Sequence, residues 1–541
     1  MSQFSLQIQG LHLLIHRKAM VFNGLTKKDT SALKGFAILC IICHNFFHHL
    51  NPSPGENEFL FSPNTIHGFF NMLGEQPMEF INIIFSYLGH FGVQVFILLS
   101  GYGLAVSMLK HEKDWTTFMV DRLKKLYPLL LTGIIVLMLY KIVDEKSFFA
   151  HYEWTEVKYK LLFISNLIPN SGLSLNGPWW FFGLIFELYL LFPLLYKLIR
   201  RFGWKAFAVV CVLSYGLIFL FRNVFNLYQG EILMMNAPGH LPEFCLGILL
   251  AFHKDVKIHP AWLMLAIAVF CLGNFFAAFY PFTFLAVSVI VLFLYQGLKS
   301  LPHRKGWLAK AAVYFGELSM VLFAIHGFFR DPFIKINNIG DSFGSHLLAF
   351  LLFFLTVWIV ALGAKKVYEW LSSAFARIKV RESRATQIVG IVLQAAFGLF
   401  FAYVIAYYII QNVKTPQKEI ENYETKETEI SICNDAEFTT FARVNFDVRP
   451  VTLKIEGSFD LMSHDTVSPL PIIVFDINGV LWDKTVIPES LNTSECNRYG
   501  FSYEYKCPLN KNIRGKQLKI YFWNNSKCSI EAKDIELSIK Y

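Results

Sequence analysis

Long apolar runs recur along this chain from Ser31 to Ile410, and they constrain its fold more than any other feature. Each run has about 17–25 residues, which is enough for an α-helix to cross a hydrocarbon layer about 30 Å thick. We count about eleven such runs. Because a backbone inside a bilayer must satisfy its own hydrogen bonds, the sequence predicts a polytopic α-helical membrane protein. The predicted spans are 31–50, 83–109, 127–143, 177–199, 206–221, 237–253, 261–278, 281–298, 311–329, 347–364 and 388–410.

The composition and the distribution of charge agree with this class of protein. Of 541 residues, 54% are hydrophobic and only 16% are charged, which excludes an ordinary soluble protein. The basic segments all fall on the side that alternate crossings would place inside the cell, so we expect a cytoplasmic N-terminus and, with an odd number of crossings, an extracytoplasmic C-terminus. The net charge of +9 then reflects the excess of Lys and Arg on the cytoplasmic side of the membrane, and we expect no nucleic-acid partner.

The chain changes character after the last predicted span. Residues 414–541 carry 16 Lys and Arg against 19 Asp and Glu, a net charge of −3. Short alternating runs with "NG" and "NN" turns predict a small all-β, sandwich-like outer domain. Its four cysteines, Cys433, Cys496, Cys507 and Cys528, can form two disulfides in an oxidising exterior, in three connectivities. The predicted division is 1–30 (cytoplasmic segment), 31–365 (membrane core), 366–411 (basic loop and extra transmembrane helix), 412–430 (charged linker) and 431–541 (outer β-domain).

The first predicted span, "LKGFAILCIICHNFFHH", carries ionisable side chains in an otherwise apolar stretch. Lys34 and His44 are ten residues apart, which places them about 15 Å apart along a helix axis. Ionisable groups inside a membrane are costly and mark functional sites by default. His44 is therefore a candidate general base, since a neutral imidazole accepts protons near neutral pH. Lys34, near the cytoplasmic end, can also simply extend its amino group to the interface.

The next two spans add further polar candidates. The second contains "FGVQVFILLSGYGL", whose small residues permit close helix packing and whose Ser100 can hydrogen-bond across helices. It is followed by "FMVDRLKKLYP", where Arg122, Lys124 and Lys125 form a basic patch suited to phosphates, although positive-inside sorting requires the same residues. The cysteines show no metal-ligand spacing, and we expect no metal ion.

Six sequence blocks follow one another between about Asp29 and Ala364. They are "K-G-x8-H", "FGVQVFILLSGYGL", "F-x3-R-x2-KLYP", "PWWFFGLIFELYLLFP", "LPEFCLGILLA" and "ELSMVLFAIH". In this order and spacing the chain resembles the acyltransferase 3 family of integral membrane acyltransferases. The resemblance implies a core of about ten helices that moves an acyl group, usually acetyl from acetyl-CoA, to hydroxyls of extracytoplasmic carbohydrates such as cell-envelope polysaccharide or lipopolysaccharide. Acetyl-CoA or another acyl-CoA would be the donor substrate, with no bound cofactor.

The resemblance also implies roles for single residues. The candidate catalytic histidine of the family falls on His44, and the arginine ten residues before it is Lys34 here, which keeps the charge without the guanidinium fork. The basic motif falls on Arg122 and Lys125, with Lys124 beside them as a further donor-binding residue. The other predicted site residues are Ser100 and Tyr189 as oxyanion donors, Glu243 as a group that orients His44, binds the sugar or caps the structure, and Trp180, His90 and His326 for substrate binding.

The sequence thus predicts an O-acyltransferase of the bacterial inner (plasma) membrane. Its expected partners are acyl-CoA, a carbohydrate acceptor, membrane lipid and polysaccharide-assembly proteins. Two other classes of function stay open at this stage. A transporter fits, because intramembrane His, Lys and Glu and a proline-broken sixth span also suit a substrate pathway. A sugar-sensing receptor fits if aromatic side chains of the outer domain stack on sugar rings.

Overall fold

The computed structural model describes seven longer stretches of the chain and a set of strands. The stretches are 20–145, 149–168, 171–221, 231–253, 256–299, 306–337 and 342–378, and they are followed by single positions between 388 and 406 and by strand segments between 421 and 540. The chain divides into two compact units, whose main boundary lies between Phe401 and Ala402.

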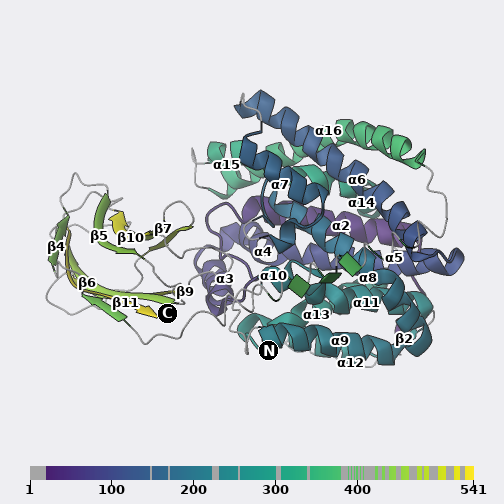
Figure 1. Cartoon of the computed structure of the whole chain (residues 1–541), viewed down its shortest axis with the longest axis horizontal. Coiled ribbons are helices and arrows are strands. Elements are labelled where there is room, and N and C mark those ends of the chain that lie inside the picture. Colours follow the sequence, from purple (N-terminus) through teal and green to yellow (C-terminus); the bar gives the residue numbers. More distant parts are fainter. Residues whose placement is uncertain are drawn as a thin grey trace, which may run out of the picture. The chain divides into compact units, whose positions relative to one another are not determined.

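The first unit is built almost entirely from helices, which appear as coiled ribbons in Figure 1. The longer ones are α2 (Lys27–Phe47), α5 (Gly92–Lys110), α6 (Trp115–Tyr140), α8 (Trp180–Phe202), α9 (Trp204–Phe219), α11 (Ala237–Phe252), α12 (Pro260–Phe275), α13 (Thr283–Lys299), α14 (Trp307–Ile325) and α16 (Phe343–Ala376). The shorter ones are α3 (Pro63–Glu75), α4 (Phe80–Leu88), α7 (His151–Leu161), α10 (Glu231–Met234) and α15 (Asp331–Asn337), together with the single 3-10 turns η1 (Pro77–Glu79), η2 (Gly89–Phe91), η4 (Ser165–Leu167), η5 (Gly177–Trp179), η7 (Tyr280–Phe282) and η8 (His326–Phe328).

Many of these helices are long and apolar enough to cross a bilayer. Within the described stretches, seven segments qualify by length and composition: 27–47, 77–110, 115–143, 177–202, 280–297, 307–328 and 343–376. The shorter apolar helices α9, α11 and α12 join them. These helices overlap the first ten predicted spans, which confirms a polytopic helical membrane protein. The predicted eleventh span, 388–410, lies outside the described residues except for single positions.

The third predicted span differs from the observed helix at its start. We expected it to begin at Tyr127, whereas α6 begins at Trp115. Asp114 caps the helix by accepting hydrogen bonds from the backbone N–H groups of Thr116 and Thr117. The basic residues before Pro128 therefore lie on the helix itself. A hydropathy pattern does not detect this charged first part of a membrane helix.

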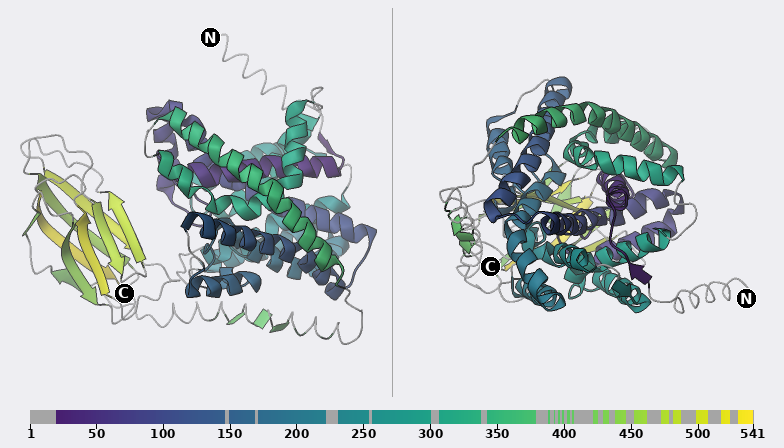
Figure 2. Two further views of the ribbon diagram at one scale, coloured as in Figure 1. Left: turned by 90° about the horizontal axis from the view of Figure 1, so that it is seen from above. Right: turned by 90° about the vertical axis from the view of Figure 1, so that its right-hand side faces the viewer.

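Helix α2 lies within the helical unit and packs against α4, α5 and α14. A capping box starts it, because the Asp29 carboxylate accepts from the backbone N–H of Thr26 at 2.9 Å. The same carboxylate accepts from Tyr295 at 2.7 Å and from Lys299 at 2.9 Å on α13. The start of α2 is thus anchored to a helix far away in the sequence. In the left view of Figure 2, the long helix α16 runs obliquely across other helices of this unit.

Helices α5 and α11 touch through glycines, as the small-residue block predicts. A Cβ atom on Gly101 would lie 2.1 Å from the Phe244 carbonyl oxygen, and one on Gly247 would lie 2.1 Å from that of Leu98. Neither space admits a side chain, so the two backbones are in direct contact. A short antiparallel ladder between β1 (Met20–Phe22) and β2 (Val256–Ile258) joins the segment before α2 to the segment after α11.

The second unit contains antiparallel strands. They are β3 (Glu421–Glu424), β4 (Glu429–Ile432), β5 (Phe438–Asn445), β6 (Thr452–Leu461), β7 (Ile472–Ile477), β8 (Leu481–Val486), β9 (Arg498–Lys506), β10 (Gln517–Trp523) and β11 (Ile530–Lys540). One sheet has the order β5-β10-β7-β8, and the other has the order β3-β11-β6-β9 with β4 also paired to β11. The four cysteines expected to form disulfides lie outside the described residues.

Candidate active site

His44 lies in the last turns of α2 and is buried, with 5% of its surface exposed. Its Nδ1 atom is 3.0 Å from the Ser86 carbonyl oxygen and 3.2 Å from that of Phe85. Because carbonyl oxygens only accept hydrogen bonds, Nδ1 carries the proton and donates it. In the neutral ring the lone pair is therefore on Nε2, which is the atom that can act as a base.

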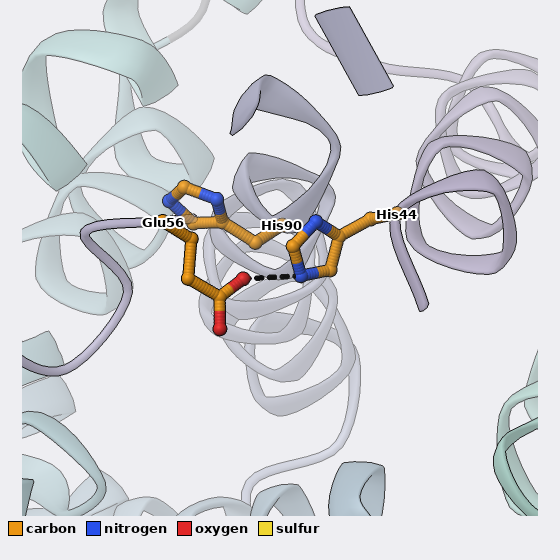
Figure 3. A group of neighbouring side chains, drawn as sticks. All are labelled: His44, Glu56 and His90. Carbon is orange, nitrogen blue, oxygen red and sulfur yellow. Dashed lines mark ion pairs between the residues drawn. The ribbon is translucent and has the colours of Figure 1, made fainter. Parts of the chain in front are cut away.

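Glu56 reaches His44 from the segment that joins α2 to α3. Its Oε2 atom lies 2.5 Å from His44 Nε2, as the dashed line in Figure 3 shows. Burial opposes the charge on this carboxylate, but the charge of His44 and its contact with Glu56 prevail and lower the pKa of Glu56 to about 2. The carboxylate is thus ionised at neutral pH.

The segment that carries Glu56, residues 51–62, is held in place by side chains rather than by regular structure. Asn57 accepts from the backbone N–H of Ser62 at 2.9 Å, and Ser53 pairs with Ser86 at 3.0 Å. The Tyr280 hydroxyl donates to the carbonyl oxygen of Glu58 at 2.8 Å. Burial, followed by the charge of Glu56, raises the pKa of Glu58 to about 8. The two neighbouring acids therefore differ in charge at pH 7.

The turn η2 brings His90 next to His44. Gly89 makes this possible, because a Cβ atom there would lie 2.7 Å from the His44 Cβ. His90 is 1% exposed, and its ring centroid is 5.5 Å from that of His44. Neither of its ring nitrogens makes a hydrogen bond of good geometry to the described residues. The predicted His90 thus lies next to His44.

Ser100 lies away from His44, because α5 runs antiparallel to α2. The beginning of α5 is next to the middle of α2, since a Cβ atom on Gly92 would lie 2.5 Å from the Ala37 carbonyl oxygen. Further along α5, the Tyr102 hydroxyl accepts from the backbone N–H of Leu25 at 2.8 Å, before α2 begins. Ser100, two residues before Tyr102, is therefore near the Lys34 end of α2.

The predicted basic residues gather at that same end. The charges of Arg122 and Lys34 both act on Lys125, and the Arg122 guanidinium lies 5.4 Å from the centre of the Phe118 ring. Tyr189 contacts Phe118 with ring centroids 6.4 Å apart, and it also lies in the field of Arg122. Lys124 is half-buried on the same turn of α6. The structure therefore brings Tyr189 to the basic cluster rather than to His44.

Glu243 belongs to a second buried pair. Its Oε1 atom lies 2.7 Å from Nδ1 of His240, whose Nε2 donates to the Met234 carbonyl oxygen at 2.7 Å. Trp180 stacks on His240 with ring centroids 5.8 Å apart and meets Phe59 edge-on at 5.1 Å. Through Phe59, segment 51–62 connects Trp180 to the neighbourhood of Glu56. The acid that contacts His44 is thus Glu56, whereas Glu243 contacts His240.

Two other polar residues of the motif blocks are fully surrounded. Glu187 accepts from the backbone N–H of Ala237 at 2.7 Å and so caps the first turn of α11. His326 is 0% exposed and donates from Nδ1 to the Leu322 carbonyl oxygen at 3.0 Å. Its Nε2 is buried and makes no hydrogen bond to the described residues.

Sequence reasoning missed Glu56 and His240. The signal for Glu56 was the segment "NPSPGENEF", in which two prolines and a glycine follow a histidine-rich helix end and introduce two acids. Such a turn-rich segment can fold back on the helix that precedes it. The signal for His240 was its i,i+3 spacing from Glu243 on a predicted helix.

Comparisons with known proteins give two matches to the chain. A family model described as an acyltransferase domain matches residues 29–365 of the chain. Acyltransferase MdmB of Streptomyces mycarofaciens is 34% identical over 141 residues, which cover 23% of this chain and 35% of that protein. The chain thus spans about a third of the length of this curated relative. No solved structure matches the chain.

Proposed function

The chain belongs to the acyltransferase 3 family of integral membrane acyltransferases, and from this premise we propose that it moves an acetyl group from acetyl-CoA to a hydroxyl of an extracytoplasmic carbohydrate. The contact between His44 Nε2 and Glu56 Oε2 at 2.5 Å carries the proposal. A buried histidine with a fixed Nδ1 and a carboxylate at Nε2 is equipped for general base catalysis.

His44 acts on the acceptor hydroxyl. The hydroxyl displaces the Glu56 carboxylate from Nε2 and gives its proton to that atom while its oxygen attacks the thioester carbonyl carbon. The tetrahedral intermediate breaks its C–S bond, and the leaving thiolate takes the proton from Nε2. The products are the carbohydrate ester and the CoA thiol, and no covalent enzyme intermediate is needed.

Glu56 and His90 support this step in different ways. Displaced by the acceptor, Glu56 stays close enough to stabilise the imidazolium that forms when His44 takes the proton. The buried nitrogens of His90 have no partner of good geometry in the described residues, so one of them can donate to the acceptor or to the developing oxyanion. Ser100 and Tyr189 lie toward the donor end and suit donor contacts better than oxyanion contacts.

The basic cluster at the Lys34 end suits the anionic part of acyl-CoA. Lys34, Arg122 and Lys125 share this region, and the buried Arg122 Nε makes no hydrogen bond to the described residues. Arginine and lysine bind phosphates through charge-assisted hydrogen bonds. Lys34 and His44 are separated by about 15 Å along α2, a distance that the extended arm of an acyl-CoA must bridge to bring its thioester to Nε2.

We propose the following orientation. The basic cluster faces the cytoplasm, in accord with the positive-inside distribution of Lys and Arg, and segment 51–62 faces outward. The two antiparallel sheets of the second unit then form an extracytoplasmic β-sandwich that presents the glycan. The acceptor class is a cell-envelope polysaccharide or lipopolysaccharide, and the bacterial inner membrane is the location.

The test compares wild type, His44→Ala and the matched control His49→Ala, each purified in detergent. Thiol release from acetyl-CoA is followed with and without a crude envelope glycan, and ester formation is followed by mass. Loss of a general base lowers the rate by about 10²–10⁴-fold, so we expect that loss in His44→Ala and a wild-type rate in His49→Ala. If His44→Ala matches an active wild type, His44 is structural and the mechanism fails. If wild type is inactive with several acyl-CoAs and glycans, the transporter and receptor alternatives gain support.

A further inference from the structure

His44, Glu56 and His90 form a cluster of ligand atoms from three parts of the chain. One ligand atom from each residue lies within 4.8 Å of the other two. His44 comes from α2, Glu56 from segment 51–62 and His90 from η2, and Figure 3 shows the three side chains next to one another. This set of two imidazoles and a carboxylate is a common ligand set for divalent transition metals.

A fourth candidate ligand, His48, lies next to this cluster. His48 follows His44 at the H-x3-H spacing that puts two histidines on one helix face. Its Nδ1 lies 3.8 Å from Glu56 Oε2, and its ring centroid is 5.3 Å from that of His44. This buried Nδ1, like both nitrogens of His90, makes no hydrogen bond of good geometry to the described residues. Buried polar atoms without partners are rare.

The surroundings of His44 also suit a metal ligand. Metal-binding histidines usually donate their second N–H to a carbonyl or carboxylate, which fixes the tautomer and the ring orientation. The Nδ1 of His44 does this with the carbonyl oxygens of Phe85 and Ser86, at 3.2 Å and 3.0 Å. Nε2 is therefore the atom presented to the cluster, in the form that a metal requires.

We propose that His44, His48, His90 and Glu56 bind one divalent transition-metal ion, with Zn²⁺ as the type case. This replaces our expectation from the sequence that no metal binds. A tetrahedral zinc site with metal–ligand distances of about 2.0–2.1 Å separates its ligand atoms by about 3.3 Å. The contact between His44 and Glu56 at 2.5 Å must widen and the longest separation in the three-residue cluster, at most 4.8 Å, must shorten.

Metal binding and base catalysis compete for the same atom. A metal ion takes the lone pair of His44 Nε2, which is the proton acceptor in the mechanism above. Zn²⁺ therefore inhibits acyl transfer, and a chelator restores it. This consequence rests on the proposed function, whereas the binding site itself does not.

The test measures metal binding without reference to activity. Full-length chain in detergent, purified with an affinity tag that contains no histidine, is titrated with Zn²⁺, and bound metal is counted after removal of the excess. Co²⁺ replaces Zn²⁺ in a parallel titration, because its visible absorption reports tetrahedral coordination. The variants are His90→Ala and His48→Gln, with His49→Gln as the matched control. Thermal unfolding of each variant without metal shows that it is folded.

We expect one tight equivalent in wild type and in His49→Gln. The affinity falls at least tenfold in His90→Ala and in His48→Gln, since loss of one ligand from a four-ligand site has an effect of this size or larger. A wild type without a stoichiometric site, or affinity that is equal in all folded variants, overturns the proposal. If the chain binds Zn²⁺ as expected but needs it for acyl transfer, the binding site stands and the competition with base catalysis is wrong. A chain that is inactive with every acyl donor still tests the metal site.

Discussion

Replacing Gly89 by alanine tests the placement of the catalytic histidine. An added Cβ would lie 2.6 Å from the Cys40 carbonyl oxygen and 2.7 Å from the His44 Cβ. Carbon atoms in contact need about 3.5 Å, so α2 and η2 must separate by about 0.8 Å. The φ angle of Gly89 is −68°, which any residue adopts, so the effect is purely steric.

The size of the effect follows from these distances. Overpacking of this kind costs about 1–3 kcal/mol of stability. A shift of about 1 Å at a catalytic group lowers the rate by about 10²-fold. We therefore expect Gly89→Ala to remain folded at 4 °C, to unfold at a lower temperature and to transfer acetyl groups between tenfold and a hundredfold more slowly.

The assay measures initial rates of acceptor-dependent thiol release together with thermal unfolding in detergent. Gly103→Ala on α5 is the matched control, because a Cβ there meets no atom within 4 Å. This control should keep the wild-type rate. A Gly89→Ala protein with the wild-type rate would refute the close contact between η2 and His44. Equal losses in both variants would show that the effect is not local.

Three further predictions concern the acids and the donor end. At pH 7, Glu56→Gln removes a charge and should lower kcat about 10²-fold. Glu58→Gln replaces an acid with a pKa of about 8, so its kcat should stay within a factor of about three of the wild-type value. Equal losses of kcat in the two variants would contradict the assignment of Glu56 as the acid that supports His44. The folded-state pKa of Glu58 is raised above its usual 4.5, so its contribution to stability is complete below pH 4.5 and is lost as the pH rises to 8. The unfolding temperature of Glu58→Gln relative to wild type should therefore increase between pH 5 and pH 8 and then level off. A difference in unfolding temperature that stays constant over this pH range would argue against a raised pKa of Glu58. Arg122→Ala should raise the KM for acetyl-CoA about tenfold through loss of a charge-assisted hydrogen bond, with little change in kcat, whereas Arg201→Ala should not; an unchanged KM would remove Arg122 from the donor site.

Hydropathy predicted the membrane helices, because it depends on local sequence. Lys34 and His44 belong to one helix, so their separation follows from helix geometry alone. The partner of His44 could not be predicted in this way. Glu56 reaches it through a segment without periodicity, whose path depends on turns and on contacts with Ser86 and Tyr280.

The prediction that Ser100 and Tyr189 donate hydrogen bonds to the oxyanion shows a second limit of inference from the sequence. Both belong to apolar helices that the sequence predicts well. Which end of a neighbouring helix they approach depends on helix direction and register, and these become visible only through contacts such as that of Tyr102 with Leu25. Sequence spacing within one helix carries no information on that register.

The position of Glu56 over Nε2 bears on a side reaction that every membrane acyltransferase faces, the wasteful cleavage of its donor by water. Before water can be activated by His44, it must separate two groups that lie 2.5 Å apart in a buried site. A bulky acceptor that makes many contacts with the site can meet this cost, but a single water molecule cannot. Thiol release from acetyl-CoA without glycan should therefore be slow in wild type. Equal rates with and without glycan would contradict this protection of the donor by Glu56. The carboxylate would then protect the donor until its proper acceptor arrives.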